Sequence, residues 1–411
     1  MRLVHILMLP VLALAALSCN RSGGAGNQAQ YGEGQASLRP AALWQGEGDP
    51  GPDPAMNKPD ETAWRLFGDV VSDQGGAPKF TSWASDADTF KENPVWPGEQ
   101  KNLSATPGTI KPRTARPTLM LAGRGKLKTA AHQIAPNTLH DVATEEVRRN
   151  RPAFDFIKSN RLYSYSGLKA AFGRDLRFTK GSLEVKTNWL PVGQLAKYYP
   201  KEVAADPHRY FLVLKDGMGA EHALLSMHII SNLVPNWTWA TFEHWANPGR
   251  CDIIGCRDSF GATKAVVPPN PQPEGNYGMC DKTPALQAIL AKLPKVFANY
   301  CLKGSQTDFT DPTGLAIRLG NSITEGGFVE SSSCMTCHAT AAWKPDGSPL
   351  DTGTPIGPVP STDFWTTGSK PPMQGAPDLK RVATQADFVW AIPFCAFDDR
   401  DPKNPKASRC A

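Results

Sequence analysis

The chain's most reactive residue types gather in one short run. Cys334 and Cys337 are separated by two residues, and His338 follows directly. On one turn of helix, two thiols at this spacing can form thioether bonds to the two vinyl groups of a porphyrin, and the adjacent imidazole then reaches the iron. The run therefore predicts one covalent haem c, with His338 as an axial ligand of the iron.

Two other interpretations of these cysteines compete with haem. Cys334 and Cys337 could form a redox-active disulfide, or they could join Cys251 and Cys256 in a zinc site. The first lacks the strand–helix pattern that surrounds a thioredoxin-like motif. The second needs four reduced thiols, and the spacing of the 251/256 pair is loose for zinc. The adjacent histidine and the N-terminal export pattern favour haem.

The run from Cys334 to His338 resembles the attachment motif of c-type cytochromes. Longer stretches resemble a poorly characterised group of large bacterial single-haem cytochrome c proteins, over about residues 140 to 400. This resemblance implies a haem protein of the cell envelope and brings no established substrate. The stretches that carry it are 183–186, 227–228, 235–244 and 387–390.

The second axial position of the iron decides the chemistry. A second strong ligand makes an electron carrier, whereas an open position allows gas binding or peroxidase-like and oxygenase-like reactions. Met373 follows a proline pair, in an order that resembles small class I cytochromes. His228, on an expected strand, and His244 are the rivals. None of the three need be an iron ligand. Met373 could be a packed loop methionine, His228 a core histidine bonded to backbone, and His244 a surface histidine.

The N-terminus predicts export. Arg2 precedes an apolar run over residues 3–17, which is too short to span a membrane. The end of this run resembles a bacterial lipoprotein signal, which implies lipidation of Cys19 and attachment to a membrane. An ordinary secretory signal is the alternative. The absence of an acidic residue at Asn20 favours the outer membrane.

The remaining six cysteines form an even set, which in an oxidising compartment suggests three disulfides. Six cysteines allow 15 pairings, and proximity along the chain favours 251–256, 280–301 and 395–410. Some could instead be free buried thiols. The six are Cys251, Cys256, Cys280, Cys301, Cys395 and Cys410.

Hydrophobic periodicity predicts an α+β fold with an antiparallel sheet and a few helices. Helices are expected from Asp141, around residues 168–172 and from Thr283, while residues 61–135 are expected to be irregular. We divide the chain into a signal peptide, a flexible tether, an α+β body and a loop-rich haem-binding region, at 1–18, 19–60, 61–330 and 331–411. Alternation of apolar residues predicts strands at 182–189, 210–214, 222–230 and 236–242.

Charge and length narrow the functional classes. A net charge of +5 over 411 residues is a weak bias and argues against nucleic-acid binding. No catalytic residue is assigned. We expect an envelope cytochrome that passes electrons between redox partner proteins. A single-haem oxidase, oxygenase or peroxidase-like enzyme, and a haem-based gas sensor, are the alternatives, because the chain is much longer than a carrier needs.

Overall fold

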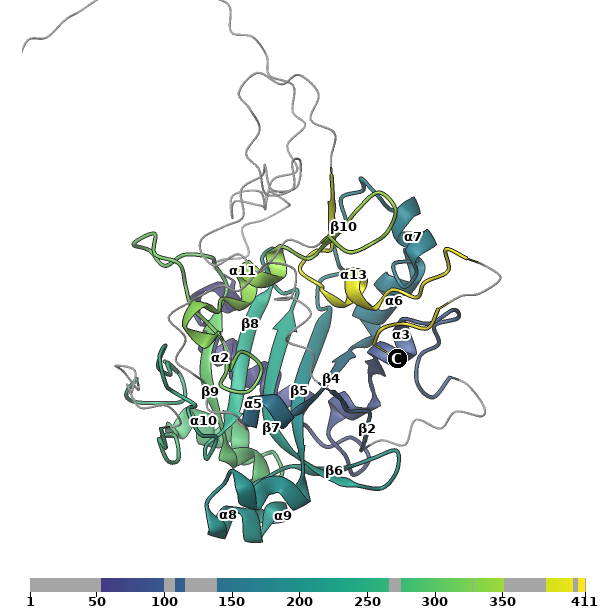
Figure 1. Cartoon of the computed structure of the whole chain (residues 1–411). Coiled ribbons are helices and arrows are strands. Elements are labelled where there is room, and N and C mark those ends of the chain that lie inside the picture. The colour runs from purple at the N-terminus through teal and green to yellow at the C-terminus, as the bar shows by residue number, and fades with distance from the viewer. Residues whose placement is uncertain are drawn as a thin grey trace, which may run out of the picture. The chain divides into compact units, whose positions relative to one another are not determined.

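The computed structural model describes residues 53–99, 108–114, 139–265, 275–326, 328–350, 382–401 and 406–410. Their centre is an open sheet in which five longer strands lie side by side, each antiparallel to its neighbours (Figure 1). In order across the sheet they are β4 (Thr144–Arg149), β5 (Leu183–Pro191), β7 (Glu221–Ser231), β8 (Thr238–His244) and β9 (Tyr300–Gln306).

Short strands extend this sheet. Strands β1 (Ala84–Ser85) and β3 (Arg113–Thr114) pair with β4, β6 (Val213–Asp216) forms a hairpin with β7, and β2 (Thr109–Ile110) runs parallel to β6. The described helices are short, except for α2 and α6. They are α1 (Pro54–Asn57), α2 (Pro59–Val70), α3 (Asp86–Thr89), α5 (Leu139–Val142), α6 (Arg151–Ser159), α7 (Tyr165–Ala170), α8 (Lys201–Ala205), α9 (Pro207–Tyr210), α10 (Pro284–Leu290), α11 (Cys334–Ala339) and α13 (Ala391–Cys395), with 3-10 turns η2 (Lys79–Ser82), η3 (Val192–Lys197), η4 (Lys295–Asn299) and η5 (Val329–Ser331).

The α+β class predicted from periodicity is confirmed. Strands β5, β7 and β8 and helices α7 and α10 lie close to the expected ranges, whereas β6 begins three residues later than expected. The Thr283 side chain accepts a hydrogen bond from the Leu286 N–H, and Pro284 occupies the first turn of α10. These two residues specify the start of α10, because the Thr283 side chain bonds a free N–H group and Pro284 has no N–H group that needs a partner.

Two sequence predictions are wrong. The first half of the helix expected from Asp141 is wrong, because α5 ends at Val142 and residues 144–149 form β4. The second half of that prediction is confirmed as α6, which buries Phe154 and Ile157. Pairing along all six residues of β4 with β5 outweighs the local helical pattern. Helix α2 was also missed, and it begins within the expected tether. Its buried Ala63, Trp64, Phe67 and Val70 form one apolar stripe.

The two faces of the sheet differ in kind. On one face α2 packs against the strands, with the Phe67 ring 4.5 Å from that of Phe242. On the other face the directly opposed residues are polar: Glu145, Asn188, Ser226 and Glu243 in one row, and Lys186, His228 and Thr241 in the next. Most of these polar side chains are buried.

Strand β9 contains a β-bulge. Gly304 lies opposite Thr241 and Leu302 lies opposite Phe242, so Lys303 is an extra residue between them. Leu302 consequently joins the apolar face, where it packs in the core with Phe242. The bulge therefore lets one strand supply both faces.

The described residues of the region 331–411 pack against the rest of the body. Helices α11 and α13 and the antiparallel pair of β10 (Ala342–Trp343) with β11 (Thr384–Gln385) bury side chains in one core with α6, α7 and the start of β8. Figure 1 shows α11 beside the start of β8. Among the described residues, no helix is long and apolar enough to cross a membrane.

Candidate functional site

Helix α11 holds the predicted cysteines and histidine on consecutive turns. The carbonyl of Ser333 accepts a hydrogen bond from the Cys337 N–H at 2.9 Å, so the run begins a regular helix. The end of β9 anchors its start, because the Gln306 side chain bonds the Ser333 hydroxyl at 3.2 Å and the Met335 N–H at 3.3 Å. The Cys334 side chain is buried, and those of Cys337 and His338 are partly exposed.

The thiols of Cys334 and Cys337 are unpaired. Burial raises the pKa of Cys337 to about 11, and it raises that of Cys334 well above its ordinary value. A redox-active dithiol needs a lowered thiol pKa, so these values argue against that interpretation. The zinc interpretation fails too, because Cys251 is bonded to Cys256.

The six other cysteines of the body form the three pairs expected from their proximity along the chain. Cys280 is bonded to Cys301, and Cys395 to Cys410. Cys19, the predicted lipidation site, lies outside the described residues. The thiols of α11 are thus the unpaired ones among the described cysteines.

His338 is oriented by two contacts. Its Nδ1 lies 2.7 Å from the carbonyl oxygen of Phe388, which can only accept, so Nδ1 carries the proton and the Nε2 lone pair remains available. The ring also packs against Trp239, with centroids 4.7 Å apart. Burial lowers the pKa of His338 to about 4, with a smaller contribution from Lys186. The imidazole is therefore neutral at pH 7, as a metal ligand must be.

A second group of functional side chains lies beside this helix. We call it the polar cluster. Its titratable members lie on five strands and on the loop after β9. Several of them influence the pKa values of Cys334, Cys337 and His338 electrostatically. The members are Glu145, Lys186, His228, Glu243, Lys303 and Glu325, with Asn188, Asn321, Ser322 and Thr324 bonded among them.

Asn321 fixes the centre of the polar cluster. Its Oδ1 accepts the backbone N–H groups of Ile323 and Thr324 at 2.9 and 2.6 Å, so its Nδ2 faces His228 and donates to Nε2 at 2.7 Å. The same Nδ2 donates to the Thr241 hydroxyl at 3.1 Å. Nε2 of His228 is therefore an acceptor without a proton. Burial, and next Lys186, lower the pKa of His228 to about 3, which agrees with a neutral ring.

The carboxylates of the cluster have opposite environments. Burial raises the pKa of Glu325 to about 7; its carboxylate accepts the Asn321 N–H at 2.7 Å and lies 3.5 Å from His228. Glu243, fully buried, accepts from Ser322 and lies 3.6 Å from the Lys303 amine. Burial lowers the pKa of Lys303. One acid is thus poised near neutrality, and the other is held as an ion pair.

Lys186 forms the cluster's partly exposed edge. Its amine lies 2.8 Å from Glu145, and about a third of its side chain is exposed. Burial acts to lower the pKa of Lys186, but the charge of Glu145, the hydrogen bond to it and the charge of Glu325 together outweigh burial, and the net shift is upward. Lys186 is consequently charged at the boundary with solvent.

Two further candidates for the second axial ligand of the iron are His244 and Met373. His244 is fully buried, and is not the surface group considered as its alternative. Both its nitrogens are used: Nε2 bonds the Tyr210 carbonyl at 3.1 Å, and Nδ1 accepts the Ala246 N–H at 3.2 Å. Its ring stacks on Phe211, which makes it a core histidine. Met373 lies outside the described residues.

Sequence inspection missed Asn321, Thr324 and Glu325. They belong to a turn between β9 and α11 that has no periodicity, and their partners are 80 to 136 residues away in the chain. The one available signal was Asn321 itself, because asparagine often closes turns through its side chain. That signal predicts a turn and says nothing of His228.

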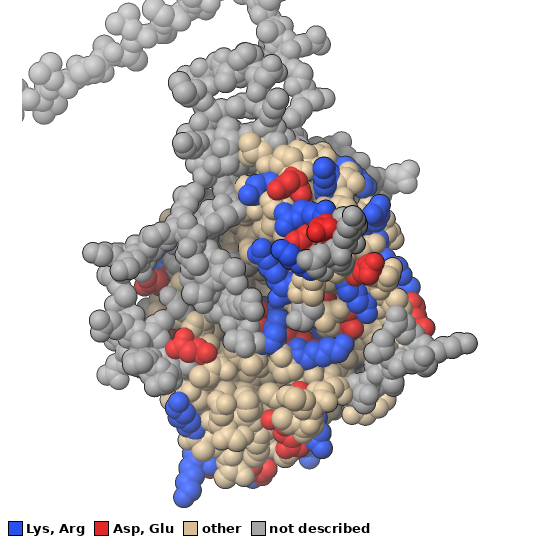
Figure 2. Space-filling model, turned by 45° about the vertical axis from the view of Figure 1, so that its right-hand side comes forward, with Lys and Arg blue, Asp and Glu red and all other residues tan. Residues whose placement is uncertain are grey.

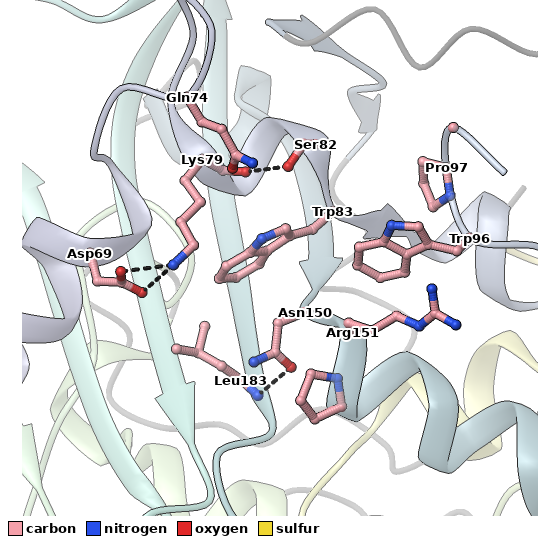
Figure 3. A pocket seen from close by; sticks show the side chains of 12 residues that line it. Asp69, Gln74, Lys79, Ser82, Trp83, Trp96, Pro97, Asn150, Arg151 and Leu183 are labelled. Atoms are coloured by element: carbon pink, nitrogen blue, oxygen red, sulfur yellow. Dashed lines mark hydrogen bonds and ion pairs between the residues drawn. The ribbon is translucent and has the colours of Figure 1, made fainter.

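A pocket of about 510 Å³ lies on another part of the body, and none of the residues above lines it. Figure 3 shows Trp83 and Trp96 in it, with Lys79 pointing toward Asp69. Its charged side chains are paired, Lys79 with Asp69, and Arg151 with Glu99 and Asp155. We assign no chemistry to this pocket.

Surface charge is mixed. On the face drawn in Figure 2, Lys and Arg side chains lie among Asp and Glu side chains. Among the described residues, surface ion pairs join Lys111 to Asp88 and Arg400 to Asp398.

Comparison with protein-family models, with curated proteins and with solved structures finds no match to this chain.

Proposed function

We propose that this chain is a c-type cytochrome, with one haem bound covalently through Cys334 and Cys337 and ligated by His338. The observation that carries the proposal is the donor set of α11. It combines two unpaired thiols with an imidazole whose Nδ1 proton is committed to Phe388, which leaves Nε2 free for iron. The donors fit haem by type, protonation state and spacing along one helix.

The proposed role is electron transfer in the bacterial cell envelope, between redox partner proteins. The bound haem supplies a one-electron Fe(III)/Fe(II) couple. The chain's own residues would hold and orient it: the two cysteines would bind it covalently, and Phe388 and Trp239 hold the His338 ring. Three disulfides and the lipoprotein-like N-terminus support an oxidising compartment and a membrane tether at Cys19.

The first experiment asks whether haem is attached. The chain is produced in a bacterium that matures c-type cytochromes, and denaturing gels are stained for haem. The wild type is expected to retain haem, and the double variant Cys334→Ala/Cys337→Ala is expected to lose it. Met335→Leu, on the same turn but without a donor, is the matched control and retains haem. A wild type without covalent haem contradicts the proposal.

For the second axial ligand we propose Met373 over His228, because the Nε2 of His228 already accepts a hydrogen bond from Asn321. We expect Met373→Ala to convert a low-spin spectrum to a high-spin one, and His228→Gln to leave it low-spin. The reverse result assigns the ligand to His228. If neither variant changes the spectrum, both assignments are wrong.

A second candidate function is that of a haem enzyme with an open iron position. The polar cluster beside α11 favours it, because buried ionisable groups are costly and perturbed pKa values concentrate at functional sites. Glu325, with a pKa of about 7, is suited to exchange protons at neutral pH. Carbon monoxide separates the functions: rapid binding to the reduced wild type contradicts the carrier, and no binding contradicts the enzyme and the gas sensor.

A further inference from the structure

Two consecutive residues near α11 have a backbone conformation that L side chains rarely adopt. Asp387 has φ of 45° and Phe388 has φ of 71°, and neither is glycine. Such residues persist only where their surroundings hold them, and they concentrate where geometry serves a function. The pair lies just before the segment that leads into α13.

Specific contacts hold this turn from both sides. The Asp387 carboxylate accepts the buried backbone N–H of Phe178 at 2.8 Å, across 209 residues of sequence. The Phe388 side chain is buried, and its ring lies 5.9 Å from that of Trp239. On the far side, Trp390 donates from its indole to the Cys337 carbonyl at 3.1 Å. The turn is therefore tied to both the body and α11.

Phe388, one of the two residues with positive φ, supplies the carbonyl that bonds His338. Phe388 has the larger positive φ, and its carbonyl oxygen is 2.7 Å from Nδ1. A backbone carbonyl on Nδ1 sets the tautomer and the ring angle of a metal-ligating histidine and increases electron donation from Nε2. The same residue packs on Trp239, which also contacts the His338 ring.

We propose that the Asp387–Phe388 turn is a positioning element for the axial histidine, with Asp387 as the latch that keeps the Phe388 carbonyl on Nδ1. This inference rests on the proposed haem function and deepens it. The turn stabilises the oxidised iron by strengthening electron donation from His338, so the reduction potential depends on a carboxylate that touches neither haem nor ligand.

The test measures the reduction potential of the haem-loaded protein for three variants. Asp387→Ala removes the latch and leaves a residue that disfavours positive φ, and we expect the potential to rise. Asp387→Asn keeps an acceptor oxygen and tolerates positive φ, so it should restore the wild-type potential. Asp399→Ala is the matched control, because Asp399 accepts the Ser166 N–H at 2.8 Å in another turn; its potential should equal that of the wild type.

A wild-type potential in a folded, haem-loaded Asp387→Ala variant overturns the inference. If that variant does not fold, the wild type still decides, through the NMR signal of the His338 Nδ1 proton. A slowly exchanging, hydrogen-bonded proton supports the positioning role, and a proton that exchanges as in free imidazole overturns it. A wild type without covalent haem would contradict the proposed function and not this inference alone. Gel staining for haem detects that outcome before any reduction potential is measured.

Discussion

The two faces of the central sheet are both buried but are stabilised differently. The face under α2 uses aromatic and aliphatic contacts, such as Phe67 on Phe242 and Trp64 at 5.0 Å from Phe242. The opposite face carries two lysines, three glutamates and a histidine that form ion pairs with one another, and three of these six side chains, His228, Glu243 and Lys303, are buried. Apolar burial stabilises without directional requirements, whereas a buried polar network contributes only when each member is satisfied. The Lys303 amine of the polar face has no hydrogen-bond partner among the described residues, so we expect this face to stabilise the fold less than the apolar face does.

The largest expected effect tests the apolar face. Phe67→Ala removes a fully buried ring that contacts Phe242, Phe297 and Tyr300. We expect the free energy of unfolding in urea to fall by about 4 kcal/mol, the usual cost of deleting a buried phenylalanine. Met218→Ala, at a 92% exposed position, is the control and should change it by less than about 0.5 kcal/mol. A loss of under 1 kcal/mol for Phe67→Ala would show that α2 contributes little to this face.

The next effect tests the polar face. Glu243→Ala leaves the buried Lys303 amine without its counter-charge. We expect a loss of about 3 kcal/mol, because an uncompensated buried charge is costly. The double variant Glu243→Leu/Lys303→Met removes both charges and should recover about half of that loss. A double variant less stable than Glu243→Ala would show that the pair itself stabilises the fold.

The third prediction is a pH dependence. Glu325 has a folded pKa of about 7 and an ordinary value of 4.5, so between these values the folded state binds one more proton than the unfolded state. Its contribution is therefore favourable below pH 4.5 and declines as the pH rises to 7, by about 1.4 kcal/mol per pH unit. Glu325→Gln should lack this decline when unfolding is measured from pH 4 to 8. Glu330→Gln, at an exposed position, should retain it.

The smallest expected effect lies on the surface, away from both faces. Arg151 pairs with Glu99 and Asp155, but half of its side chain is exposed. Arg151→Ala should cost less than about 1 kcal/mol, since solvent and salt screen such pairs. The measurement is again urea unfolding, and its result should approach zero in 1 M salt. A salt-independent loss of 2 kcal/mol would mean that Arg151 acts through packing on Trp96.

The sequence predicted what depends on local patterns. Strands β5, β7 and β8 follow from alternation, and the Cys334–His338 run is readable because its chemistry needs only five residues. What failed depends on distant partners. Residues 144–149 look helical alone but pair with β5, and Glu325 has no signal because its neighbours His228 and Lys186 come from other strands. The carbonyl that orients His338 belongs to a residue 50 positions later.

The β-bulge in β9 is a one-residue insertion that brings the Lys303 amine to the polar cluster. Deletion of Lys303 would remove the bulge and keep the pairs on both sides in register, because Leu302 already lies opposite Phe242 and Gly304 opposite Thr241. Leu302 and Tyr300 would therefore stay in the apolar core. The deletion would instead remove the amine that lies 3.6 Å from the Glu243 carboxylate. The extra residue in β9 thus serves the polar face, and the apolar face does not depend on it.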